Sequence, residues 1–317
     1  MIVDCAIPSP WHGRIDMTEG DAGQRWHQIV VPLSPDTAAG AVALLGFQCD
    51  TGVARNNGRV GAAEGPAAIR EILRNLPVHR LDRIVDAGDV ICVGDELETA
   101  QAELAKQVCC LLDSGHFPIV LGGGHEMAYA SFCGLEQHLD AQRAPRIGII
   151  NLDAHFDLRL SEHGNSGTPF RQIAERSAER GWSFNYCCLG VSRFSNTQSL
   201  FDRAKSLGAT WRLDEEMGVA QLDENLATLK CFLTSVDIIY LTICLDVLPA
   251  AIAPGVSAPA ARGVALEVIE PLIDLVTASG KLRLADIAEM NPKFDIDQRT
   301  ARVAARLVAR IAESMSS

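Results

Sequence analysis

Residues 146–157 read Arg-Ile-Gly-Ile-Ile-Asn-Leu-Asp-Ala-His-Phe-Asp, a short apolar run followed by a group of polar side chains. The run at 146–150 is typical of a buried strand. Side chains alternate between the faces of a strand, so an extended backbone would point Asp153, His155 and Asp157 the same way. α/β folds bind ligands at the carboxyl ends of parallel strands, which is where this polar group stands.

Strand-like and helix-like segments alternate along the rest of the chain. The pattern predicts further strands at 41–47, 83–90, 117–121, 186–191, 237–245 and 282–288. It predicts helices at 67–76, 97–112, 126–139, 170–180, 197–207, 222–233, 266–279 and 297–313. This alternation indicates an α/β fold with a central, mostly parallel β-sheet that is flanked by helices on both faces.

The chain is long enough, at 317 residues, for one large α/β domain. We see no linker, repeat or low-complexity tract, and we therefore expect a single domain over residues 1–317. Residues 1–40 are polar and punctuated by proline and glycine, so we expect a partly irregular lead-in with one short helix.

The composition argues against several classes of protein. Hydrophobic residues make up 48% and charged residues 21%, as in soluble globular proteins. A net charge of -12 without a basic stripe argues against nucleic-acid binding, and no apolar run approaches the ~20 residues that span a membrane. The ten cysteines contain no C-x-x-C pattern, and the amino terminus does not resemble a signal peptide. We therefore expect reduced thiols and a cytoplasmic location.

Three of the predicted strand ends carry side chains that can bind metal ions. Besides residues 153–157, His125 follows a run of three glycines, and Cys244 and Asp246 share one face of their strand by alternation. The glycines let the backbone turn tightly, but the pattern of a phosphate-binding loop is absent. Alone, His125 would more often be a structural histidine.

Together these strand ends supply enough donors for two metal ions about 3.5–4 Å apart, an arrangement common in hydrolases. Carboxylate oxygens and imidazole nitrogens suit hard or borderline divalent cations. The candidate metal ligands are His125, Asp153, His155, Asp157, Cys244 and Asp246.

Several motifs make the chain resemble the ureohydrolases of the arginase and agmatinase superfamily. They are Gly-Gly-Gly-His-Glu at 122–126, Asn-Leu-Asp-Ala-His-Phe-Asp at 151–157, the strand that ends in Asp246, and Glu-Met-Asn-Pro at 289–292. Within the superfamily the chain is most similar to the formimidoylglutamase branch. That narrower similarity rests on residues 11–16, 57–62, 156–159, 166–170, 254–259 and 291–301. The resemblance implies an arginase-like fold.

The resemblance also implies two manganese ions (Mn2+) and the hydrolysis of N-formimidoyl-L-glutamate to L-glutamate and formamide in histidine degradation. His125 would bind one ion and His155 the other, with Asp153 as a bridge between them. Asp157 would bind the first ion and relay a proton as a general acid, and Asp246 would bind the second.

Two further positions acquire a role from the resemblance. Glu289 matches the glutamate that engages the cationic amidinium group of the substrate. Cys244 falls where most of the superfamily has a bridging aspartate. A thiolate keeps the negative charge but is softer, so it should weaken the preference for manganese and be open to oxidation once metal is lost. We expect Cys244 to be a ligand; the alternative is a buried thiol without that role.

The expected substrate is a small molecule with two carboxylates, which need cationic partners. An arginine fork matches a carboxylate well, and the candidates are Arg159 first, then Arg193 and Arg59. Each of them could instead be an ordinary surface arginine. Residues 166–169 read Ser-Gly-Thr-Pro where arginase-like enzymes have a histidine-glycine pair, which argues against arginine as the substrate.

Two alternatives remain open at this point. The chain could hydrolyse another amidino or guanidino compound, such as guanidinobutyrate or agmatine, although agmatine has no carboxylate for the arginines. It could also be a metal-poor homologue that binds or regulates without catalysis, an interpretation that Cys244 alone favours. From the superfamily we also expect a homo-oligomer.

Overall fold

The computed structural model describes residues 11–81, 83–139 and 145–316. Within these residues nine strands form one sheet in the order β1-β3-β2-β4-β9-β8-β5-β6-β7, and every neighbouring pair is parallel. The predicted α/β fold with a central parallel sheet is therefore confirmed. The first ten residues of the expected lead-in lie outside the described residues.

Each strand predicted from an apolar run is present, and two short strands were not predicted. These two, β1 and β7, lie at the edges of the sheet and bury their side chains only in part or not at all, so they lack an apolar run. The strands are β1 (Val31–Pro32), β2 (Val42–Gln48), β3 (Ile84–Ile91), β4 (Phe117–Leu121), β5 (Ile147–Leu152), β6 (Asn185–Val191), β7 (Thr210–Leu213), β8 (Ile238–Cys244) and β9 (Leu282–Ala288).

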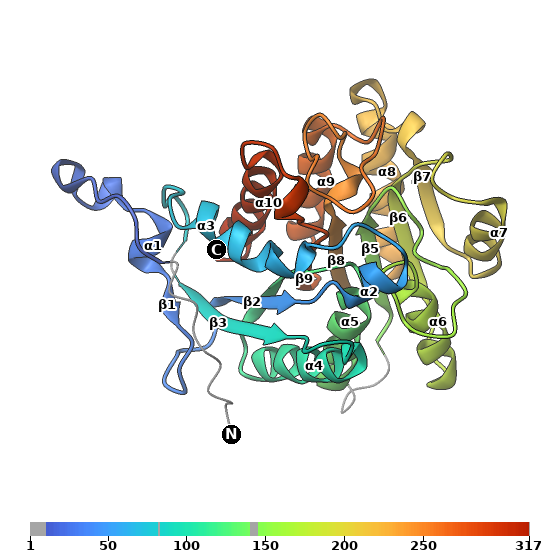
Figure 1. Cartoon of the computed structure of the whole chain (residues 1–317), viewed down its shortest axis with the longest axis horizontal. Coiled ribbons are helices and arrows are strands. Elements are labelled where there is room, and N and C mark those ends of the chain that lie inside the picture. Colours follow the sequence, from blue (N-terminus) through green and yellow to red (C-terminus); the bar gives the residue numbers. More distant parts are fainter. Residues whose placement is uncertain (1–10, 82, 140–144, 317) are drawn as a thin grey trace.

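The helices cover both faces of this sheet. Figure 1 shows α3, α9 and α10 on one side of it and α4 and α5 on the other. The predicted helices are all present, and α1 agrees with the short helix expected within residues 1–40, whereas α2 was not predicted. The helices are α1 (Trp26–Ile29), α2 (Thr51–Arg55), α3 (Gly65–Leu73), α4 (Leu97–Asp113), α5 (Met127–Leu139), α6 (Pro169–Glu179), α7 (Gln198–Ser206), α8 (Leu222–Ser235), α9 (Leu266–Thr277) and α10 (Arg299–Met315).

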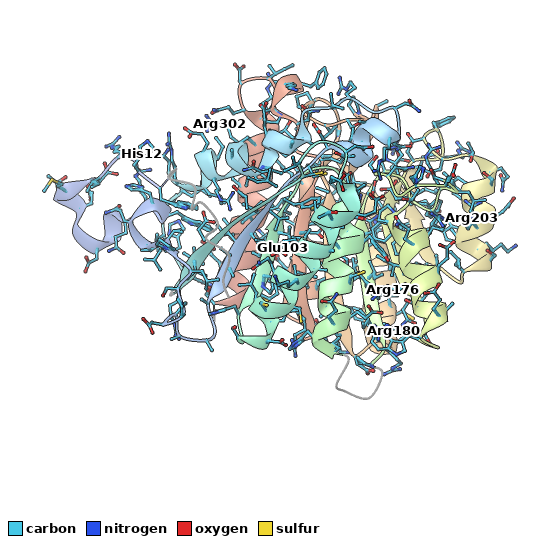
Figure 2. The ribbon with its side chains drawn as sticks, turned by 60° about the horizontal axis from the view of Figure 1, so that its bottom comes forward. His12, Glu103, Arg176, Arg180, Arg203 and Arg302 are labelled. Carbon is cyan, nitrogen blue, oxygen red and sulfur yellow. The ribbon has the colours of Figure 1, made fainter. Side chains whose placement is uncertain are left out.

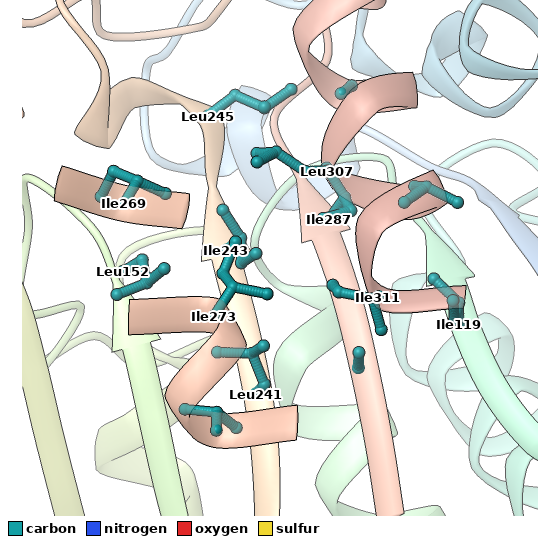
Figure 3. Packing of buried hydrophobic residues seen from close by; sticks show 14 of the residues in the cluster. Ile119, Leu152, Leu241, Ile243, Leu245, Ile269, Ile273, Ile287, Leu307 and Ile311 are labelled. Carbon is teal, nitrogen blue, oxygen red and sulfur yellow. The ribbon is translucent and has the colours of Figure 1, made fainter. Parts of the chain in front are cut away.

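Two apolar cores fill the space between the sheet and its helices. Strand β8 contributes to both because its side chains alternate in direction. Leu241 and Ile243 pack in the core beneath α3, α8, α9 and α10, and Figure 3 shows them beside Ile269 and Ile273 of α9. Tyr240 packs in the other core, beneath α4 to α7. Both faces of the central strand are thus buried, as expected for a parallel sheet.

Helix α6 is joined to α5 by a buried carboxylate. Glu136 of α5 is fully buried, and its two oxygens lie 2.5 Å from Nε of Arg176 and 2.6 Å from Nε of Arg180. Figure 2 shows both arginines together at one end of the helical layer. A buried charge that is paired in this way is costly to break, so the pair holds the carboxyl-terminal end of α6 against α5.

The strand order decides which loops meet. Strands β4, β9, β8 and β5 are consecutive neighbours in the middle of the sheet. Because all of them are parallel, their carboxyl ends lie along one edge. The segments that follow them begin at 122, 289, 245 and 153, and they contain Glu289 and every predicted metal ligand except Cys244, which is the last residue of β8. The fold therefore brings together residues that are far apart in the chain.

Candidate metal centre and substrate cavity

The segment after β5 is bent rather than extended. The strand ends at Leu152, and Asp157 adopts a left-handed backbone with φ 48°. The prediction that strand alternation orients Asp153, His155 and Asp157 is therefore wrong about the backbone, because no strand exists past Leu152. The bend nevertheless directs all three side chains toward residues from neighbouring strands.

His125 is held by a glycine loop that has no room for side chains. The Gly123 N–H donates to the Phe47 carbonyl at 3.0 Å, and a Cβ atom at Gly123 would lie 2.2 Å from the carbonyl oxygen of Cys49. This close approach explains the glycine and seats His125, which is 1% exposed, at the end of β4. Its Nε2 hydrogen-bonds the Thr242 hydroxyl at 3.0 Å, so Nδ1 is left to face the site.

The Nδ1 atom of His125 lies among carboxylates without a proper partner. It is 3.0 Å from one oxygen of Asp153 and 3.0 Å from one oxygen of Asp157. It nonetheless forms no well-directed hydrogen bond to any described residue. A buried imidazole nitrogen aimed between two carboxylates is what a divalent cation requires, so this orphaned atom fits a metal ligand.

A second histidine faces the other side of Asp153. The Nδ1 atom of His155 lies 3.1 Å from Asp246 and 3.5 Å from Asp153. Asp246 sits in the 3-10 helix η5 (Leu245–Val247), directly after Cys244, the last residue of β8. All six predicted ligands are therefore adjacent at one edge of the sheet.

Their donor atoms form two groups that share one residue. In each group the atoms lie within 4.8 Å of one another. Asp153 belongs to both, which is the position that a bridging carboxylate would take between two ions. The groups are His125, Asp153 and Cys244, and Asp153, His155 and Asp246.

The site concentrates negative charge that needs a cation. Burial, reinforced by the charge of Asp153, raises the pKa of Asp157 to about 6. Burial likewise raises the pKa of the Cys244 thiol well above its usual range, and Asp153 and Asp246 add to the rise. Burial alone would lower the pKa of His125, but Asp153 and Asp157 raise it well above its ordinary value. Divalent ions would replace these protons as the balancing positive charge.

Glu289 stands beside the donors, at the end of β9. Its backbone is left-handed, with φ 71°, and its N–H donates to the Gly123 carbonyl at 2.8 Å. One oxygen of its carboxyl group accepts a hydrogen bond from the backbone N–H of His125 at 3.0 Å. The other oxygen has no hydrogen-bond partner among the described residues. Burial, with the charges of Glu126 and Asp246, raises the pKa of Glu289 to about 8. This carboxyl group is poised to pair with a cation.

The donors open into a cavity of about 420 Å³, a size suited to a small metabolite. Two of the three predicted arginines, Arg59 and Arg159, line it. Sequence reasoning had not singled out several of the polar residues in its wall, although Ser166 and residues 57 and 58 lie in the motifs that carry the resemblance. The cavity is lined by Asn56, Asn57, Gly58, Arg59, His125, His155, Asp157, Arg159, Ser166, Cys244, Asp246, Ser257, Ala258 and Glu289.

The third arginine, Arg193, is not brought to the cavity. Its guanidinium group pairs with Glu215 at 2.9 Å and lies 5.0 Å from the centre of the Phe194 ring. The predicted contact with a substrate carboxylate therefore has no support from its position. The signal behind the prediction was local, since Arg193 does follow the carboxyl end of β6, but β6 lies next to β5 and outside the four strands that bear the donors.

The sequence matches known proteins over most of its length. The profile of the arginase family matches residues 40–313. The formimidoylglutamase of Ralstonia nicotianae is 62% identical over 316 residues, which cover 98% of this chain and 97% of that protein. The formimidoylglutamase of Aromatoleum aromaticum is 54% identical, with 97% and 92% covered.

Solved structures show the same relationship. The formiminoglutamase of Trypanosoma cruzi with Mn2+2 superposes with a TM-score of 0.78 at 26% identity, over 90% of this chain and 96% of that one. The formimidoylglutamase of Bacillus subtilis has the same fold, with a TM-score of 0.82 at 20% identity over 92% of each chain. The chain therefore belongs to the arginase family.

Proposed function

We propose that this protein hydrolyses N-formimidoyl-L-glutamate to L-glutamate and formamide, a step of histidine degradation. One observation carries the proposal. Two arginines, Arg59 and Arg159, line the same cavity as Glu289 and the two groups of metal donors. Relatives at 50–62% identity are formimidoylglutamases, which supports the same substrate here.

Two manganese ions fit the donor set of the cavity. His125, Asp157 and Cys244 would hold one ion, His155 and Asp246 the other, and Asp153 both. The related Trypanosoma cruzi protein contains manganese in its structure. When bound, such a pair supplies Lewis acidity that activates water and polarises the C–N bond to be cleaved.

Glu289 would bind the reacting end of the substrate. A formimidoyl carbon becomes a good electrophile when its nitrogen carries a proton, and a carboxylate beside it favours that cation. The unpartnered oxygen of Glu289 is available for this contact. Cations near Glu289 would lower its raised pKa, so the group would be ionised when ions and substrate are present.

Hydrolysis forms a bond from the water oxygen to the formimidoyl carbon and breaks the bond from that carbon to the glutamate nitrogen. The departing nitrogen must receive a proton. Asp157 lines the cavity, where its carboxylate could take a proton from water and return it to the amine. Asp157 is therefore the proposed proton relay.

Arg59 and Arg159 would bind the two carboxylates of the substrate. Both line the cavity, and neither forms an ion pair with a carboxylate of the described residues. An arginine that has no acidic partner in a polar cavity is well suited to a carboxylate. Agmatine lacks any carboxylate and a guanidino acid has one, so this pair favours a dicarboxylate.

The proposal also covers the location and the assembly of the protein: a cytoplasmic homo-oligomer. Every cysteine in the described part of the chain is a free thiol, which suits a reducing cytoplasm. No helix among the described residues is long and apolar enough to cross a membrane. A homo-oligomer is expected from the family.

Turnover of a panel of substrates tests the proposed specificity. With metal-loaded protein, kcat/KM should be highest for N-formimidoyl-L-glutamate, lower for guanidinobutyrate and lowest for agmatine. Arg159→Met should reduce the preference for the dicarboxylate, whereas Arg193→Met should leave it unchanged. Equal kcat/KM for all three compounds would refute the role of the arginines.

A further inference from the structure

The guanidinium group of Arg59 is held in place by neutral groups alone. Its Nε donates to the Ser257 carbonyl at 3.0 Å and its Nη2 donates to the Val256 carbonyl. Its carbon Cζ lies 4.0 Å from the centre of the Phe294 ring. No carboxylate of the described residues forms an ion pair with it, so the group is oriented but its charge is not neutralised.

Phe294 is a partly exposed residue near the cavity residue Arg59. The residue belongs to the 3-10 helix η6 (Pro292–Phe294) and is 38% exposed. Neither of the two apolar cores formed by the described residues contains it. The face of its ring lies against the guanidinium group of Arg59, and the aromatic quadrupole attracts this cation.

One short segment joins this contact to the reacting end of the cavity. Glu289 begins the segment, and Phe294 follows five residues later. Between them, the Asn291 side chain donates to the Arg59 carbonyl at 2.8 Å and accepts the Lys293 N–H at 3.2 Å. The segment therefore fixes the spacing between Glu289, which is proposed to bind the amidinium group, and the guanidinium group of Arg59.

We infer that Phe294 is a positioning residue that holds Arg59 for a substrate carboxylate and so helps to select acidic substrates. The inference rests on the proposed function, because it takes Arg59 as a carboxylate partner. Carbonyl bonds restrain one edge of the guanidinium, and the ring restrains its plane. A carboxylate then meets a fixed donor edge rather than a mobile side chain.

Kinetics of Phe294→Leu test the inference on metal-loaded protein. The variant should raise KM for N-formimidoyl-L-glutamate about fivefold, as expected from losing one cation–π contact, and leave kcat within about twofold. Phe294→Tyr should restore the wild-type KM because it keeps the ring. Ile296→Ala is the matched control, since Ile296 is exposed in the same segment and should change neither value.

A double variant shows whether Phe294 acts through Arg59. If it does, Phe294→Leu should have no further effect on KM in an Arg59→Met background. Independent effects that multiply, or a fall in kcat with KM unchanged, would overturn the inference.

Calorimetric binding of L-glutamate separates this inference from the proposed reaction. Glutamate presents the same two carboxylates, so Phe294→Leu should weaken its binding about fivefold. If the wild type does not hydrolyse N-formimidoyl-L-glutamate but shows this weakening, the reaction is wrong and the inference stands. Equal binding by both proteins, or binding by neither, overturns the inference.

Discussion

One carboxylate oxygen of Asp153 lies 3.0 Å from Nδ1 of His125, while its other oxygen is turned toward His155. A single side chain thus serves both donor groups. Asp153→Asn removes the charge and one acceptor, and we expect the protein to retain fewer than one of its two ions after dialysis, by elemental analysis. Asp202→Asn, an exposed change on α7, is the control. Retention of two ions by Asp153→Asn would contradict a bridging role.

Cys244 is the last residue of β8. Its thiolate would be a softer metal ligand than a carboxylate at the same position. Burial, and after it the nearby carboxylates, keeps the pKa of the thiol high until a metal ion displaces the proton. Cys244→Asp should therefore bind Mn2+ more tightly in competition with a chelator, and Cys244→Ala more weakly than the wild type. Unchanged manganese retention and activity in both variants would mean that Cys244 is not a ligand.

Thr242 orients the ring of His125 from behind. Its hydroxyl group forms a hydrogen bond with Nε2 of His125 at 3.0 Å and also contacts the buried Asp286. Burial raises the pKa of Asp286, and hydrogen bonds from the hydroxyl groups of Thr242 and Tyr240 oppose that rise. Thr242→Val keeps the shape but removes the hydroxyl, so manganese affinity should fall roughly 10–100-fold. Thr242→Ser should restore it. Equal manganese affinity of the valine and serine variants would show that the Thr242 hydroxyl does not orient His125 for the metal.

Glu126 makes the stability of the metal-free protein depend on pH. Burial raises its pKa from 4.5 to about 7, and one of its oxygens accepts the Gly52 N–H at 2.9 Å. Because the folded state holds this proton more tightly than the unfolded state, the contribution is present below pH 4.5. It is lost as the pH rises through about 7.

Glu126→Gln keeps the contact with Gly52 and removes the titration. Between pH 5 and pH 8 the free energy of unfolding of the metal-stripped wild type should fall more than that of the variant, by on the order of 3 kcal/mol. Urea unfolding at both pH values measures the difference. Parallel losses in the two proteins would show that Glu126 is not the titrating group.

The sequence predicts the frame of the site because its signals are local. Long apolar runs identify the buried strands, and Asp153 follows one of them after two residues and His125 another after three glycines. Short strands such as β1 and β7 carry no such run, because edge strands are only partly covered. The candidate ligands could therefore be named from the ends of strands, although the extended geometry expected for Asp153, His155 and Asp157 is absent.

Contacts between distant parts of the chain were beyond local reasoning. Nothing near Arg193 in the sequence shows that Glu215 binds it, or that β6 lies outside the four donor strands. The partners Arg59 and Asn291 are 232 residues apart and meet only in the folded sheet. The structure alone shows that two of the three candidate arginines, Arg59 and Arg159, line the cavity.

The most direct test of the account is release of glutamate and formamide from N-formimidoyl-L-glutamate by purified, metal-stripped protein before and after Mn2+ is restored. We expect no turnover without metal and full turnover with two ions bound per chain. Turnover that does not depend on added metal would contradict the binuclear centre. No turnover at two ions per chain, beside hydrolysis of guanidinobutyrate, would contradict the proposed substrate.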